Sequence, residues 1–146
     1  MPFFLLCYYP RKLEMPHLVI LYTPNLEAKI DMAQLCRALA DTMLTQLDEA
    51  GKHVFPTGGT RVLAYPASHF AVADGKRDYG FVYLNLRIGS GRSDAIKKEA
   101  GCALIDCARA LFDPVFKDNL VGLTLQIDEG AQVFDGKLGN LHPLFQ

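Results

Sequence analysis

Two stretches of the chain repeat the same order of apolar and polar positions. The run HLVILY at residues 17–22 is short and continuously apolar, which is typical of a buried strand. Asp31 with Gln34 resembles a capping box at the start of a helix, and Gly51 suits its end. A second strand is expected at residues 61–65. Between the two strands, apolar residues recur with helical spacing at Cys36, Leu39, Ala40, Met43, Leu44 and Leu47.

The second half of the chain follows the same order. Residues 79–88 are rich in aromatic and branched side chains and predict a strand. Ser93 suits the N-cap of a helix that we expect to end before Pro114. Apolar and polar residues alternate at 121–127, which predicts a half-buried strand. The tail at 134–145 is apolar and should dock on another surface. The helix carries an apolar stripe of Ile96, Ala100, Ala103, Leu104, Cys107, Ala108 and Leu111.

These patterns predict an α/β (α+β) fold made of two β-α-β units. A connection through a helix implies that the two strands of each unit pair in parallel. Each helix is apolar on one side only, so both helices should cover one face of a four-stranded sheet. The chain offers no cover for the other face, and we infer that other subunits cover it.

The composition narrows the possible functions. The 146 residues amount to one domain, and half of them are hydrophobic, so the chain can bury a core without metals or disulfides. Lys and Arg number 15 against 16 Asp and Glu, and a net charge of −1 gives no basic surface for nucleic acid. No apolar run approaches the roughly 20 residues that span a membrane. Any anion recognition must therefore come from a few locally placed arginines.

The cysteines and histidines show no metal-binding pattern. The cysteines lack a CxxC pair and zinc spacing, which favours free thiols and a reducing, cytoplasmic location. Two of them, Cys36 and Cys107, lie on the helix stripes and are expected to be small core residues. The histidines are too scattered to form a metal site. The residues concerned are Cys7, Cys36, Cys102 and Cys107, with His17, His53, His69 and His142.

Two arginines are candidates for binding an anion. The segment IGSGRS at residues 88–93 joins a strand to a helix, and its glycines let the backbone approach a ligand at the helix N-terminus. Arg92 adds a forked donor suited to a carboxylate. An ordinary glycine turn with a solvated arginine is the alternative, and the lysine and the spacing of a Walker loop are missing. Arg61 begins an apolar run, and taken alone it is better explained by snorkelling to the surface.

The dipeptide Met15-Pro16 is informative because of its context. If Met15 starts translation and is then removed, Pro16 has a free secondary amine, with an ordinary pKa of about 8. Partial burial and nearby arginines would lower that pKa and give a neutral base at physiological pH. The same nitrogen inside a peptide bond has no available lone pair and cannot act as a base.

Four stretches together point to a known family. They are MPHLVI at 15–20, FPTGGTR at 55–61, ADGKRDYGFVYLNLRIGSGRS at 73–93 and NLHPLF at 140–145. With them, the chain from Met15 onwards resembles the 5-carboxymethyl-2-hydroxymuconate isomerase family of the tautomerase superfamily. The third stretch is specific and is not expected by chance in another fold.

The resemblance implies a function and a set of site residues. It implies that Pro16 is the catalytic base, that Arg61 and Arg92 hold substrate carboxylates, and that the protein is a homotrimer. It implies a proton shift in a small unsaturated carboxylate during homoprotocatechuate breakdown, without a cofactor. It also makes residues 15–146 a tautomerase-like domain. Residues 1–14 become an extension that we expect to result from a start codon placed too early. A true start at Met1-Pro2 is the rival, but that segment lacks the resemblance.

The chain departs from the family pattern at several positions. Leu63 stands where other members have a second arginine, and Leu21 stands where some have an acidic residue. Tryptophans near the active-site edge are replaced by Tyr65, Pro66 and Phe70. These changes weaken any inference about which carboxylate is bound. They leave open another amino-terminal-proline reaction, such as decarboxylation or dehalogenation. If residues 1–14 are retained, a non-catalytic, anion-binding trimer is also possible.

Overall fold

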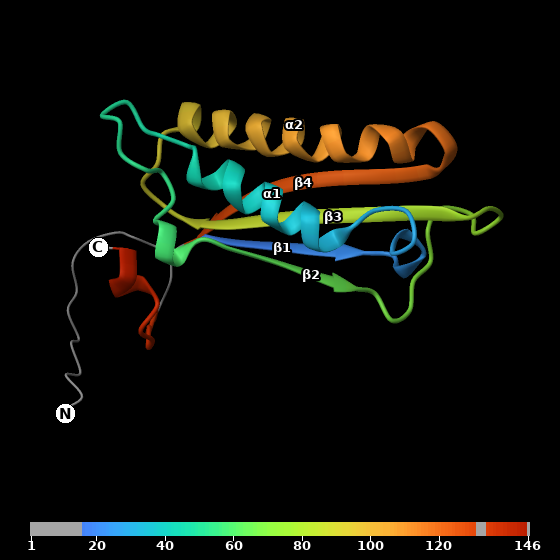
Figure 1. Ribbon diagram of the computed structural model, residues 1–146, viewed down its shortest axis with the longest axis horizontal. Helices are drawn as coiled ribbons and strands as arrows, with labels where there is room; N and C mark the ends of the chain where they lie inside the picture. The colour runs from blue at the N-terminus through green and yellow to red at the C-terminus, as the bar shows by residue number, and fades with distance from the viewer. Residues whose placement is uncertain (1–15, 131–133, 146) are drawn as a thin grey trace.

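A computed structural model of the chain describes residues 16–130 and 134–145 (Figure 1). The predicted extension at 1–14 and Met15 lie outside the described residues. The sheet has four strands in the order β2-β1-β3-β4, and both helices lie on one of its faces, as the sequence predicts. The elements are β1 (His17–Tyr22), η1 (Pro24–Leu26), α1 (Met32–Leu44), η2 (Thr57–Gly59), β2 (Arg61–Pro66), β3 (Tyr79–Gly89), α2 (Asp94–Asp118), β4 (Leu120–Gly130) and η3 (His142–Phe145).

The pairing of the strands confirms the two β-α-β units and joins them. β1 pairs in parallel with β2, and β3 pairs in parallel with β4. The two units meet where β1 runs antiparallel to β3. The starts of β1 and β2 therefore lie at the same end of the sheet as the ends of β3 and β4 (Figure 1). Pro16 directly precedes β1 at this end of the sheet, which is called the Pro16 end below.

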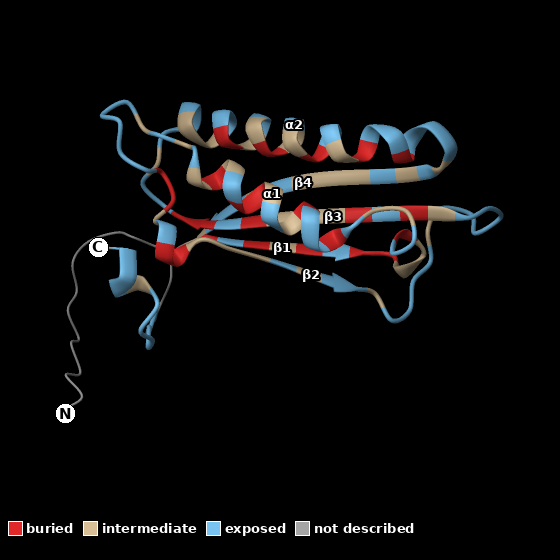
Figure 2. Cartoon of the chain, viewed as in Figure 1, coloured by how far each residue is buried: buried red, intermediate tan, exposed pale blue. Residues whose placement is uncertain are grey.

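The core fills the space between the sheet and the helices. Alternate residues of the central strands point toward the helices, and Leu18, Ile20 and Leu86 among them are fully buried. Figure 2 shows buried positions along the inner sides of the helices and strands. Cys36 and Cys107 pack at the edge of this core, as predicted, and burial raises the pKa of the Cys36 thiol.

Both predicted helix starts are confirmed by capping hydrogen bonds. The Asp31 carboxylate accepts the backbone N–H of Gln34 at 3.1 Å. The Ser93 hydroxyl accepts the backbone N–H of Ile96 at 3.2 Å. Each cap satisfies an N–H group that the first helical turn leaves without a partner.

The predicted end of the first helix is wrong. α1 ends at Leu44 instead of continuing toward Gly51. Leu47 forms an isolated antiparallel bridge with His53 and is half exposed, so it does not belong to the buried helix stripe. Gly51 has a φ of +76° and serves the turn of this small hairpin, a conformation that glycine adopts without strain.

The second helix also ends later than predicted. α2 continues through Pro114 to Asp118. Proline lacks the backbone N–H that the helix interior uses, which was the reason to expect an end before it. Pro114 is exposed, whereas Phe112 and Val115 on either side of it are buried. Burial of these two side chains favours continuation of the helix over the hydrogen bond lost at the proline.

Among residues 16–130 and 134–145, no helix or strand covers the sheet face turned away from α1 and α2. We call it the outward sheet face. Its β1, β2 and β3 residues include large apolar side chains that are 36 to 50% exposed, namely Leu21, Leu63, Tyr65 and Phe81. Figure 2 shows both helices on the opposite side. The described part of the chain therefore leaves these apolar side chains exposed, as the sequence pattern predicts.

The core position Phe112 provides a stability test. Phe112 is fully buried, whereas Phe116, one turn later in α2, is 40% exposed. Phe112→Ala should lower the free energy of unfolding by about 3–5 kcal/mol because it leaves a cavity. Phe116→Ala, the matched control, should cost clearly less. Urea denaturation at one fixed protein concentration measures both. Equal losses would show that α2 is not packed on the sheet through Phe112.

Candidate active site

The three site residues predicted from the sequence all come from the Pro16 end of the sheet. Pro16 is buried and immediately precedes β1. Arg61 is the first residue of β2 and pairs in register with His17, the neighbour of Pro16. Arg92 lies in the short connection between the end of β3 and α2. The parallel and antiparallel pairings therefore bring together residues that are far apart in the sequence.

The turn η2, which directly precedes β2, orients the side chain of Arg61. The Thr60 hydroxyl donates a hydrogen bond to the Pro56 carbonyl at 2.9 Å. The Arg61 Nε–H donates to the Gly59 carbonyl at 3.4 Å, and the side chain is half-buried. The guanidinium is thus oriented by the backbone that precedes β2, which simple snorkelling into solvent would not require.

Arg92 is held against the first half of the chain. Its guanidinium donates to the Val54 carbonyl at 3.0 Å and to the Gly89 carbonyl at 3.3 Å. The guanidinium carbon lies 5.5 Å from the centroid of the Phe55 ring, within the range of a cation–π contact. Gly91 has a φ of +113°, a conformation that a residue with a side chain rarely adopts. Arg92 is therefore a positioned cation.

The end of the C-terminal tail, η3, lies beside the turn η2, but the tail as a whole does not dock as predicted, since Phe134, Leu138 and Leu144 are 88, 96 and 73% exposed. A Cβ atom added to Gly58 in η2 would lie only 2.7 Å from the Cα of His142 in η3. The same atom would lie 3.2 Å from the ring of Phe145. Glycine at 58 thus permits η3 to approach the turn that leads directly into Arg61.

The charges around His17 were not anticipated from the sequence. Burial lowers the pKa of His17, and the positive charge of Arg61 lowers it further. Arg87 and Lys137 act in the same direction, while Asp135 opposes them. A positive electrostatic field therefore surrounds the start of β1. The same field and the burial of Pro16 would both disfavour an ammonium at a free Pro16 amine. The alternation of side chains along β3 could have indicated from the sequence that Arg87 lies on the outward side of the strand. No comparable signal in the sequence points to Asp135 and Lys137 in the tail.

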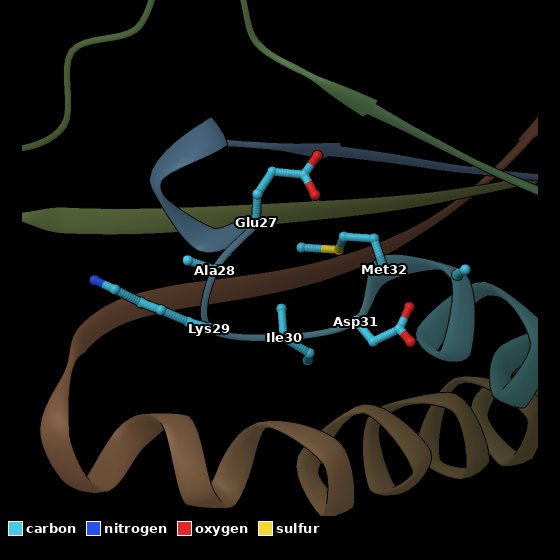
Figure 3. A pocket seen from close by; sticks show the side chains of 7 residues that line it. Glu27, Ala28, Lys29, Ile30, Asp31 and Met32 are labelled. Carbon is cyan, nitrogen blue, oxygen red and sulfur yellow. The ribbon is translucent and has the colours of Figure 1, made fainter.

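A separate hollow of about 510 Å³ lies at the opposite end of β1 (Figure 3). It is lined by Glu27–Ala33, the segment between η1 and the first turn of α1. None of the three predicted site residues lines it. Its position therefore separates it from the Pro16 end of the sheet.

Among residues 16–130 and 134–145, no group of three or more His, Cys, Asp or Glu side chains could hold a metal ion. Neither helix in that part is long and apolar enough to cross a membrane.

Comparisons with known proteins agree with one another. A family model described as 5-carboxymethyl-2-hydroxymuconate isomerase matches residues 16–145. The 5-carboxymethyl-2-hydroxymuconate Delta-isomerase of Escherichia coli is 28% identical over 132 residues, which cover 90% of this chain and 100% of that protein. A crystal structure of a 5-carboxymethyl-2-hydroxymuconate delta-isomerase is 57% identical, with a TM-score of 0.88, and covers 92% of this chain and 95% of that one.

Further solved structures extend the similarity. A 5-carboxymethyl-2-hydroxymuconate isomerase from Deinococcus radiodurans R1 is 34% identical with a TM-score of 0.80, over 92% of this chain and 96% of that one. A fused 4-OT structure is 17% identical with a TM-score of 0.52, over 89% and 96%, and shows the fold alone. The predicted tautomerase-like fold is confirmed.

Proposed function

Because the chain belongs to the 5-carboxymethyl-2-hydroxymuconate isomerase family, we propose that it is itself such a delta-isomerase, acting in the degradation of aromatic acids. The observation that carries the proposal is the family match over residues 16–145 together with 57% identity to a solved isomerase. The meeting of Pro16, Arg61 and Arg92 at one end of the sheet supports it. The substrate is a small unsaturated carboxylate, and the reaction needs no cofactor.

In the proposed reaction, Pro16 moves one proton within the substrate. Its free amine takes the proton from the hydroxyl of the dienol, so that the O–H bond breaks as a C=O bond forms. The conjugated double bonds shift, and the same nitrogen returns the proton to a carbon of the chain. Atoms and electrons balance without an oxidant. The nitrogen must be neutral at the start, which its buried position and the neighbouring cations favour.

Arg61 and Arg92 are proposed to bind substrate carboxylates. Both guanidiniums are already oriented by backbone carbonyls, Arg61 by Gly59 and Arg92 by Val54 and Gly89. A preset cation needs little reorganisation when negative charge develops on the carbonyl side in the transition state. The chemistry resembles an oxyanion hole, in which loss of one donor costs about 2.7–4 kcal/mol.

We propose that the protein works in the cytoplasm as a homotrimer. The apolar residues of the outward sheet face, such as Leu21, Leu63 and Tyr65, are about half exposed in the single chain. Contact with other copies would remove this apolar surface from water. Among the described cysteines, Cys36, Cys102 and Cys107 are free thiols, which suits a reducing compartment.

The oligomer can be tested by light scattering. The native protein should give the mass of three chains, each of 16.2 kDa at full length. Leu63→Asp should shift the mass toward monomer, because a buried, unpaired charge is costly. Glu49→Gln in the exposed α1–β2 loop should leave the mass unchanged. A stable wild-type monomer at micromolar concentration would contradict the trimer.

The arginines can be tested by kinetics. Arg61→Ala and Arg92→Ala should each lower kcat/KM by roughly a hundredfold to a thousandfold, since an oriented cation is lost. Lysine at either position should restore only part of the rate, because it lacks the forked geometry. Arg109→Ala serves as the control, since Arg109 is exposed on α2 and pairs with Asp106. Wild-type kinetics in both active-site alanine variants would show that neither arginine acts on the substrate.

The beginning of the chain provides the third test. Protein that starts at Pro16 should isomerise 5-carboxymethyl-2-hydroxymuconate, whereas the intact 146-residue chain should be nearly inactive. In the shortened form kcat/KM should rise with pH through the pKa of the Pro16 amine, because only the neutral amine accepts a proton, and this pKa should lie below about 8. Intact mass controls for the state of each sample. Equal rates in the two forms would rule out Pro16 as the base.

A further inference from the structure

Three basic side chains stand in one row across the outward sheet face. His17 on β1 pairs in register with Arg61 on β2 and, on its other side, with Arg87 on β3. The residues next to His17 and Arg87, namely Leu18 and Leu86, are fully buried toward the helices. Because successive side chains of a strand point to opposite faces, the three basic side chains share the outward face. The row begins one residue after Pro16.

Arg87 has no carboxylate partner among the described residues. Its register partner on β4 is Asp128, but the carboxylate of Asp128 accepts the side-chain amide of Asn85 at 2.7 Å. No ion pair in residues 16–130 and 134–145 involves Arg87. Its guanidinium lies beside Gly130, 3.5 Å from the position that a Cβ there would occupy, which is an ordinary van der Waals distance. Arg87 is exposed in the single chain, at the Pro16 end of the outward sheet face, whereas Leu21 and Tyr65 lie toward the other end of that face.

The electrostatics of His17 agree with this geometry. Arg61 and Arg87 both lower the pKa of His17, so both charges act on the same small region. Lys137 adds to them, whereas Asp135, which accepts a hydrogen bond from Lys137, opposes them. Arg61 and Arg87 thus place one guanidinium on each side of an uncharged imidazole, and each guanidinium is suited to a carboxylate of its own. After Arg61, the next residue of β2 on this face is Leu63, which is uncharged. The second positive charge near His17 therefore comes from Arg87 on β3.

We infer that Arg87 is a specificity-determining residue that binds a third carboxylate of the substrate. The inference rests on the proposed function. 5-Carboxymethyl-2-hydroxymuconate has the two carboxylates of a muconate and a third on its carboxymethyl group. Arg61 and Arg92 are proposed for two of them, and Arg87 supplies a guanidinium for the remaining one. The enzyme would thereby prefer the triacid to the diacid that lacks the carboxymethyl group.

Paired substrates test the inference in the form of the protein that begins at Pro16. Arg87→Gln should lower kcat/KM for the triacid tenfold or more, mainly through KM, and should leave 2-hydroxymuconate within twofold. Arg87→Lys should recover part of the triacid activity. Arg109→Gln, which removes an exposed arginine from α2, controls for net charge. An equal loss on both substrates, or no loss on either, would overturn the role of Arg87.

A binding measurement separates this inference from the proposed function. Propane-1,2,3-tricarboxylate and glutarate are titrated calorimetrically into wild type and Arg87→Gln, in the full chain and in the form beginning at Pro16. The tricarboxylate should bind Arg87→Gln at least tenfold more weakly than wild type, with glutarate little changed. Unchanged tricarboxylate affinity, or no binding to wild type, would overturn the inference. If wild type isomerises neither substrate, the proposed function fails and calorimetry alone decides on Arg87.

Discussion

The antiparallel pairing of β1 with β3 is the constraint on which the site depends. Each β-α-β unit could form its own parallel pair, yet neither pair alone assembles the candidate site. Pairing His17 with Arg87 places the start of one unit beside the end of the other. Pro16, Arg61 and the Arg92 connection then meet at one end of the sheet. A shift of one of these two strands by one residue would exchange the faces of that strand, so that either His17 or Arg87 would turn toward the helices.

The pairing of β1 with β3 also creates a positive electrostatic field around the start of β1, which the net charge of the chain does not reveal. The whole chain carries a formal charge of −1, but cations gather around the start of β1. Arg61 approaches from β2 and Arg87 from β3, while burial and these charges favour an uncharged His17. Such surroundings favour the neutral form of an amine and attract carboxylates. In the proposed reaction, the same field would serve both the base and the substrate.

Much of the fold could be predicted from the sequence because the deciding signals are local. The apolar run at 17–22, the caps at Asp31 and Ser93 and the one-sided helix stripes all correspond to observed elements. The predicted ends of the two helices were wrong, because there tertiary packing decides where each helix ends. Leu47 fits the helical spacing but bridges His53, and Pro114 is tolerated inside α2 because its buried neighbours hold the helix. Periodicity also carries no signal for the relative direction of the two units.

The candidate site also has some residues that the sequence predicts and others that only the structure reveals. Pro16, Arg61 and Arg92 could be selected from their motifs, and the structure brings them to one end of the sheet. Arg87 was missed because its significance depends on two contacts that the sequence does not show, its register pairing with His17 and the hydrogen bond between Asn85 and Asp128. Asp135 and Lys137 were missed because the tail has no regular pattern.

The proposed role of Pro16 as the base can be measured directly by ¹⁵N NMR titration of the protein that begins at ¹⁵N-labelled Pro16. The nitrogen should titrate below about 8, the ordinary value of an α-amino group, and its pKa should coincide with that governing the rise of kcat/KM. A proline nitrogen that titrates at or above the ordinary value, or away from the pKa of the kinetic profile, would contradict a neutral Pro16 base.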